Sequence, residues 1–156
     1  MQRYVFRSTW RLDAEPDEVY SALADVEGYP SWWPQVRGGR RLDESSGEIV
    51  CRSLLPYDLT FVAHRLIEDP EARVLRATLT GDLNGTSEWR IDGSGGRSVA
   101  IFDEDVQVGS GLLRAAGFAG RPVLKFNHDL MMRAGERGLR RHLLRRVGSP
   151  PPGSDP

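Results

Sequence analysis

Apolar and polar residues alternate along residues 4–12, and this period of two predicts a strand with one buried face. Residues 13–16 (Asp-Ala-Glu-Pro) are typical of a helix start. Proline suits the first turn, and acidic side chains suit the positive end of the helix dipole. Apolar residues then recur at helical spacing as far as Val26, and we expect this helix to end at Gly28.

The next segment, residues 29–34, combines the rings of Tyr29, Trp32 and Trp33 with two prolines that flank the tryptophan pair. Proline restricts its own φ angle and biases the preceding residue away from the α region, so the segment is stiff. Three large rings in six residues need an apolar surface to cover. We therefore predict a second short helix that plugs one end of the gap between a sheet and a covering helix.

Turn-forming residues then interrupt the chain at intervals of roughly 10 to 15 residues, which is typical of an antiparallel meander. The breaks include Gly38-Gly39, Asp69-Pro70 and residues 82–85. This part of the sequence contains no glycine-rich phosphate loop and no alternation of strands with helices. The predicted strands cover residues 40–43, 48–54, 59–68, 74–81, 86–92 and 98–108.

The last structured segment, residues 111–147, is predicted to be helical, with an interruption near Gly120-Arg121-Pro122. Projected at 100° per residue, residues 123–147 form an amphipathic helix about 37 Å long, enough to cover the apolar face of a seven-stranded sheet. The tail, residues 148–156, is rich in proline, glycine and serine, and we expect it to be disordered. The inward helix face carries Leu124, Asn127, His128, Met131, Met132, Gly135, Gly138, Leu139 and His142.

The composition is that of one ordinary soluble domain, with 156 residues of which 39% are hydrophobic and 28% charged. No apolar run approaches the roughly 20 residues of a membrane span, and the first residues lack the apolar stretch of a signal peptide. We therefore expect a cytoplasmic protein. Cys51 is the only cysteine, which excludes an internal disulfide and a cysteine-based zinc site. Twenty of the 21 basic residues are arginine, a bias that suggests a GC-rich bacterial genome.

The net charge of −1 is unevenly distributed, because residues 121–147 carry eight basic and two acidic side chains. The basic outer face of this helix would suit phospholipid head groups or nucleic acid. Arginines near the C-terminal end of a solvated helix also complement its dipole, which is the simpler interpretation. No nucleic-acid-binding motif accompanies the basic residues, so we expect no nucleic-acid partner, and membrane contact remains a secondary alternative.

This order of elements resembles the START-like helix-grip superfamily, also called SRPBCC or polyketide-cyclase-like, over nearly the whole chain. The residues that carry the resemblance are 14–20, 25–34, 81–85 before Trp89, 127–129, 131–132 and 135–139. The resemblance implies an α+β fold, in which a seven-stranded curved antiparallel sheet wraps around a long C-terminal helix and two short helices follow the first strand. It also implies a single domain over residues 1–147, with an apolar cavity between sheet and helix. Members include aromatase/cyclases and lipid- or quinone-binding proteins, so the fold alone leaves the function open.

Glu104 is the sharpest exception to the apolar pattern. It is the only charged residue on one face of the strand 98–108, among Ala100, Phe102, Val106 and Val108. A carboxylate in a cavity could act as a general acid or base. Alternatively, a bulge turns Glu104 outward, or Glu104 pairs with an inward arginine such as Arg52. Arg52 points inward if Val50 and Leu54 do, and it is solvated if Cys51 and Ser53 point inward instead.

Asn127 and His128 lie at the two edges of the inward helix face, where each would either contact a ligand or hydrogen-bond the loop before the helix. Gly135 and Gly138 on this face each cost about 1 kcal/mol of helix stability relative to alanine. They provide either cavity volume or close packing against the sheet. On the first interpretation, Gly138→Leu abolishes ligand binding while the fold survives. The remaining histidines, at 64 and 142, stand alone, and we expect no metal site.

Taken together, these features predict a protein that binds a hydrophobic, ring-containing small molecule of polyketide-, lipid- or quinone-like type, without a cofactor. One alternative is a polyketide cyclase or dehydratase in which Glu104 or His128 moves protons in the same cavity. Another is a lipid or quinone carrier that touches membranes through its basic helix. The sequence contains no complete catalytic constellation, so turnover stays open, and we expect a monomer or a weak homodimer. The predicted ligand-binding residues are Trp33, Arg52, Leu54, Tyr57, Phe61, Trp89, Phe102, Glu104, Asn127, His128, Met131 and Gly135.

Overall fold

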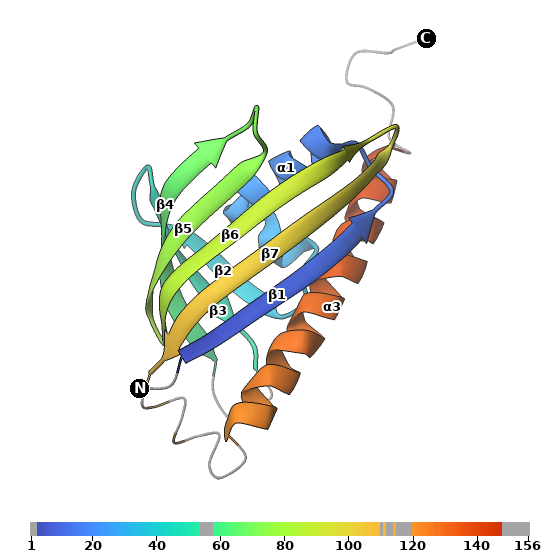
Figure 1. Ribbon diagram of the computed structural model, residues 1–156. Coiled ribbons are helices and arrows are strands. Elements are labelled where there is room, and N and C mark those ends of the chain that lie inside the picture. Colours follow the sequence, from blue (N-terminus) through green and yellow to red (C-terminus); the bar gives the residue numbers. More distant parts are fainter. Residues whose placement is uncertain (1–2, 54–57, 110, 112–113, 115–119, 148–156) are drawn as a thin grey trace.

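The computed structural model describes residues 3–53, 58–109, 111, 114 and 120–147. Within these residues, seven strands form one antiparallel sheet in the order β1-β7-β6-β5-β4-β3-β2, so the first strand pairs with the last. Figure 1 shows that the sheet curves and that α1 and α3 lie on the same side of it. The predicted helix-grip architecture is confirmed. In chain order the elements are β1 (Arg3–Leu12), α1 (Pro16–Ala24), the 3-10 helix η1 (Val26–Ser31), β2 (Val36–Arg41), β3 (Ser46–Cys51), β4 (Leu59–Asp69), β5 (Val74–Gly81), β6 (Leu83–Ser94), β7 (Arg97–Val108) and α3 (Gly120–Val147).

Several element boundaries differ from the prediction. The strand β2 begins at Val36, because Gly38 and Gly39 continue the strand instead of breaking it. A Cβ atom on Gly39 would lie 3.1 Å from the carbonyl oxygen of Val26, so this glycine allows the backbone of η1 to pack on β2. The helix α1 ends at Ala24, before the predicted end, since a 3-10 helix takes over from Val26. The tail at 148–156 and most of the helix predicted before residue 120 lie outside the described residues.

The strand β6 also begins earlier than predicted, at Leu83, so most of residues 82–85 are strand and not loop. Gly85 has a φ angle of +157°, and a Cβ atom there would collide with the carbonyl oxygen of Asp105 in β7. Glycine therefore allows β6 and β7 to approach closely at this point. Residues 82–85 were predicted to form a turn because of their composition, but most of them belong to a strand that packs closely on its neighbour.

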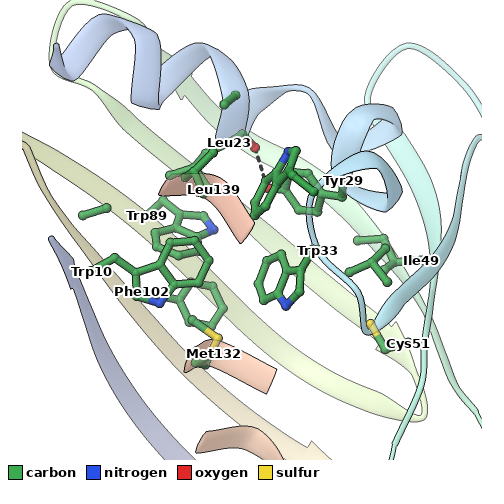
Figure 2. Close-up of a cluster of buried hydrophobic side chains, with 14 of the residues drawn as sticks. Trp10, Leu23, Tyr29, Trp33, Ile49, Cys51, Trp89, Phe102, Met132 and Leu139 are labelled. Carbon is green, nitrogen blue, oxygen red and sulfur yellow. Dashed lines mark hydrogen bonds between the residues drawn. The ribbon is translucent and has the colours of Figure 1, made fainter. Parts of the chain in front are cut away.

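All four tryptophans of the sequence gather in one cluster, although they come from three separate parts of the chain. Trp10 lies at its centre, with ring centroids 5.2 Å from Trp33 and 4.8 Å from Trp89 in edge-on geometry. Trp32 is also edge-on to Trp10. Aromatic pairs in this arrangement are favourable beyond the area that they bury. Figure 2 shows Trp10, Trp33 and Trp89 of this cluster, with Met132 and Leu139 of α3 beside them in the hydrophobic core.

Two hydrogen bonds attach the aromatic segment 29–34 to its neighbours. The Tyr29 hydroxyl donates to the carbonyl oxygen of Leu23 at 2.5 Å, and Trp33 Nε1 donates to the carbonyl oxygen of Met131 at 2.9 Å. Burial raises the pKa of Tyr29 above its ordinary value, so the hydroxyl keeps its proton and remains a donor at neutral pH. The segment therefore joins the end of α1 to the middle of α3.

Gly135 and Gly138 provide close packing and not cavity volume. A Cβ atom on Gly135 would lie 2.5 Å from the Trp33 ring and 2.7 Å from the Trp10 ring, and one on Gly138 would overlap the carbonyl oxygen of Trp32. The two glycines therefore let α3 pack mainly against the aromatic segment 29–34, and Trp10 is the contact that the sheet provides. The expectation that Gly138→Leu leaves the fold intact is wrong, because the backbone of α3 has no room for a side chain at this position.

Candidate functional site

A cavity of about 380 Å³ lies between the sheet and α3. Most strands contribute to its wall, together with η1, the turn between β2 and β3, and residues 124–132 of α3. Two predicted ligand-binding residues, Leu54 and Tyr57, lie outside the described residues. The predicted residues that line the cavity are Trp33, Phe61, Trp89, Phe102, Glu104, Asn127, His128 and Met131.

The floor of the cavity contains a row of residues that lie directly opposite one another on five neighbouring strands. Its members are Phe6, Glu104, Ser87, Ala77 and Arg65, and all of them line the cavity. Ser87 and Ala77 at the middle of the row have small side chains, which leaves space above them. The register of the sheet therefore places open volume next to the Glu104 carboxylate.

Glu104 faces into the cavity and is only 8% exposed. The strand β7 pairs with β6 without a register shift from Arg97 to Val108, so the bulge that would have turned Glu104 outward is not formed. Among the described residues, the titratable side chain in contact with Glu104 is His128, whose Nε2 lies 3.5 Å from Glu104 Oε2. The imidazole stacks on the Phe6 ring at a centroid distance of 4.0 Å and an interplanar angle of 12°. Neither ring nitrogen of His128 has a hydrogen-bond partner among the described residues.

The prediction that Arg52 lines the cavity and pairs with Glu104 is wrong. Arg52 is exposed and absent from the cavity wall, whereas Cys51 is 1% exposed and lines it. Of the two alternatives left open by the sequence, the strand adopts the one in which Cys51 points inward, and Ile49 points the same way. The backbone N–H of Arg52 donates to the carbonyl oxygen of Gln35 at 2.6 Å, which extends the pairing of β3 with β2. Because Arg52 points away from the cavity, its guanidinium stays in contact with water and its charge needs no buried partner.

The other predicted residues of α3 differ in their placement. Asn127 is buried, His128 is half-buried, and both line the cavity. Gly135 is buried but is not part of the cavity wall, because the tryptophan rings cover it. The sequence projection identified the correct helix face but not how far the cavity extends along it.

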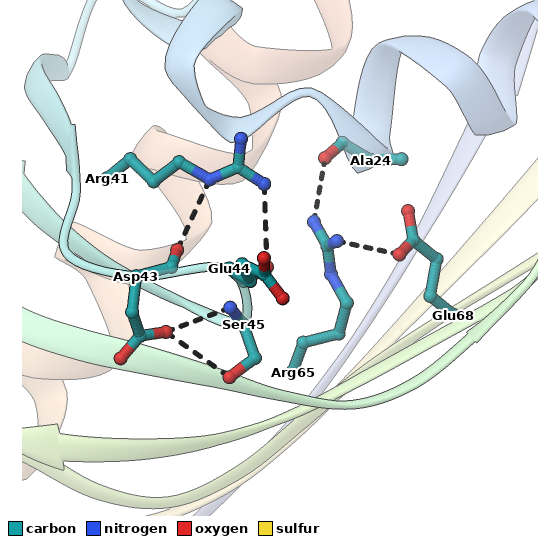
Figure 3. A network of polar contacts seen from close by, with 7 residues as sticks. All are labelled: Ala24, Arg41, Asp43, Glu44, Ser45, Arg65 and Glu68. Carbon is teal, nitrogen blue, oxygen red and sulfur yellow. Dashed lines mark hydrogen bonds and ion pairs between the residues drawn. The ribbon is translucent and has the colours of Figure 1, made fainter.

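A polar rim, which the sequence did not predict, borders the cavity where the β2–β3 turn approaches the end of α1 (Figure 3). Arg41 donates to the carbonyl oxygens of Asp43 and Glu44, at 3.2 and 3.4 Å. Arg65 pairs with Glu68 at 2.6 Å and donates to the carbonyl oxygen of Ala24 at 3.4 Å. The turn residues 43–46 were visible in the sequence only as a loop, because nothing local indicates that they fold toward α1.

The Cys51 thiol is expected to be unreactive in the folded protein. Burial, and to a lesser extent the charge of Glu104, raises the pKa of this thiol to about 12, so the reactive thiolate is scarce at pH 8. We predict that a disulfide reagent such as 5,5′-dithiobis(2-nitrobenzoic acid) labels the native protein at least about 100-fold more slowly than the guanidinium-unfolded protein. Equal rates would contradict the buried position of Cys51.

None of the helices among the described residues is both long enough and apolar enough to cross a membrane. Over the same ranges, no three side chains of histidine, cysteine, aspartate or glutamate are grouped so that they could hold a metal ion.

Comparison with known proteins assigns the chain to a group of related sequences. The profile of the family described as "Polyketide cyclase / dehydrase and lipid transport" matches residues 12–147. No match to a functionally curated protein was found by sequence comparison.

Solved structures of similar fold are numerous. The Zhui aromatase/cyclase from Streptomyces sp. R1128 is 21% identical, with a TM-score of 0.78 over 94% of this chain and 96% of that one. A START superfamily protein from Mycobacterium smegmatis is 16% identical, with a TM-score of 0.72 over 91% and 98% of the two chains. The di-domain aromatase/cyclase StfQ from the steffimycin biosynthetic pathway is 13% identical, with a TM-score of 0.71 over 94% and 53%. At these identities the similarity establishes the fold.

Proposed function

Because the chain belongs to the polyketide cyclase / dehydrase and lipid transport family, we propose that its cavity binds a hydrophobic, ring-containing small molecule. The observation that carries this proposal is the cavity itself, whose volume of about 380 Å³ lies within the range of small-molecule sites. Apolar and aromatic side chains form much of its wall, including Phe61, Trp89 and Phe102. A few polar groups would then orient the ligand.

The size and chemistry of the wall favour flat, apolar molecules. Trp89 and Phe102 lie with their ring centroids 4.6 Å apart and offer ring surface to a bound molecule. The small side chains of Ala77 and Ser87 leave the floor open for a planar group. Polyketide-like and quinone-like molecules have this character, and a lipid with a ring-containing head would also fit.

Native mass spectrometry of freshly purified protein tests the proposal. We expect a fraction of the protein to carry one additional small mass, which is released when the protein is unfolded and can be identified after extraction. An unliganded mass, together with no binding of added apolar ring compounds such as 2-naphthol, would contradict the proposal.

A second candidate function is proton-transfer chemistry of the cyclase or dehydratase type in the same cavity. The observation that favours it is the contact between Glu104 and His128, since a buried carboxylate and an imidazole can act as base and acid toward one substrate. Three of the structurally similar proteins are aromatase/cyclases by name. The two functions differ in outcome, because a binding protein returns an added linear polyketone unchanged, whereas a cyclase or dehydratase converts it with loss of water.

A further inference from the structure

The imidazole of His128 has no hydrogen-bond partner that would explain its burial in the cavity wall. Both of its ring nitrogens are buried without a partner among the described residues, and Nε2 lies beside the buried carboxylate of Glu104. The separation of 3.5 Å between His128 Nε2 and Glu104 Oε2 exceeds the usual range of an N–H···O hydrogen bond. Buried polar groups in native proteins are nearly always hydrogen-bonded, so the His128 ring calls for an additional group beside Glu104.

We propose that Glu104 and His128 together form a subsite for one hydroxyl group, phenolic or enolic, that is attached directly to a planar ring of the ligand. This inference rests on the proposed function of the cavity and specifies which molecules it takes. It follows from the spacing of the two side chains, from their chemistry and from the shape of the floor beside them.

The spacing suits a bridging oxygen. An oxygen atom at an ordinary hydrogen-bond distance of about 2.8 Å can contact both His128 Nε2 and Glu104 Oε2, because these atoms are 3.5 Å apart. A hydroxyl group then donates its proton to the carboxylate and accepts a hydrogen bond from the imidazole N–H. A ketone or an ether oxygen cannot donate, so it would face the carboxylate without a proton between them.

The aromatic surroundings hold the imidazole in place. His128 stacks on Phe6 at 4.0 Å, and Phe6 in turn stacks on Tyr4 at 5.9 Å with an interplanar angle of 16°. Phe102 lies nearly parallel to the imidazole at 6.4 Å. Rotation of the imidazole out of this plane would break these contacts, so the ring plane is held beside Glu104.

The floor next to the pair places the ring of the ligand. Ser87 lies directly opposite Glu104 in the neighbouring strand, and Ala77 lies opposite Ser87 one strand further. Because both side chains are small, a flat ring can lie above them with its substituent directed at Glu104. A hydroxyl group on a flexible chain would not need this open floor, which is why the geometry points to a hydroxyl on the ring itself.

A pair of probes that differ in one methyl group tests the inference. Dissociation constants of 2-naphthol and 2-methoxynaphthalene are measured by fluorescence titration for the full-length protein. We expect the wild-type protein to bind 2-naphthol about tenfold more tightly or better, as one charge-assisted hydrogen bond allows. The Glu104→Leu variant should bind both compounds with similar affinity, and His128→Phe, which keeps the ring stack, should show an intermediate preference.

The control variant is Glu48→Leu, which removes a carboxylate that does not line the cavity and should leave the preference unchanged. Circular dichroism checks that each variant is folded, and the isosteric Glu104→Gln replaces Glu104→Leu if the latter does not fold, with a smaller but measurable loss of preference expected. Equal binding of the two compounds by wild-type protein would overturn this inference and leave the proposed function standing. A preference that survives in every Glu104 variant would overturn it as well, whereas binding of neither compound would contradict the proposed function itself.

Discussion

The Gly138→Ala variant is expected to lose about 3 kcal/mol of unfolding free energy, the upper part of the range for overpacked sites. Its Cβ atom would overlap the carbonyl oxygen of Trp32 and lie 2.9 Å from the carbonyl carbon. Both atoms belong to the backbone, so the neighbour cannot rotate away and α3 must shift as a whole. A loss of stability would identify a steric clash, because replacing glycine by alanine in a helix interior normally raises the unfolding free energy by about 1 kcal/mol. Urea unfolding followed by circular dichroism measures the difference.

Gly38→Ala is the matched control for this variant. A Cβ atom at Gly38 has no heavy atom within 4 Å, and its φ angle is not in the left-handed region. Its unfolding free energy should therefore stay within about 0.5 kcal/mol of wild type. A Gly138→Ala protein as stable as the wild type would show that α3 does not rest on the backbone of the aromatic segment.

The second large effect is expected on binding. The Ala77→Phe variant should weaken binding of 2-naphthol by about 100-fold, because the new ring would occupy the open floor on which the ligand is proposed to lie. Since Ala77 lines the cavity, the phenyl group can enter empty space, and the unfolding free energy should change by no more than about 1 kcal/mol. Titration and native mass spectrometry both measure the loss of ligand.

The control lies in the same strand. Thr80 is exposed and does not line the cavity, so Thr80→Phe adds the same side chain outside the proposed site. We expect its affinity for 2-naphthol to equal that of the wild type. An Ala77→Phe protein with unchanged affinity would place the ligand elsewhere in the molecule.

The candidate site was predictable from the sequence where a residue stands out against a regular pattern. Glu104 interrupts an apolar strand face, and the structure places it in the cavity wall. Asn127 and His128 interrupt an apolar helix face, and they also line the cavity. Arg52 could not be placed, because a strand with apolar residues on both faces does not reveal which alternate side chains point inward.

Glycines were the most misleading residues in the sequence. Gly38, Gly39 and Gly85 resemble loop residues, yet they lie inside strands, and other backbone segments approach Gly39 and Gly85 closely. Gly135 resembles a source of cavity volume, yet tryptophan rings occupy the space above it. Gly39, Gly85 and Gly135 each mark a close contact with a residue elsewhere in the sequence, and no local pattern identifies that partner.

The sequence by itself determined the order and type of nearly all elements, since periods of 2 and 3.6 residues are local properties that survive without knowledge of the fold. Tertiary structure alone decided which of these elements meet. The contact of Glu104 with His128, the gathering of four tryptophans, and the hydrogen bond from Arg65 to the end of α1 each join residues far apart in the chain. Such contacts depend on sheet register and on the packing of α3, and both follow from the whole set of buried side chains and not from any one segment.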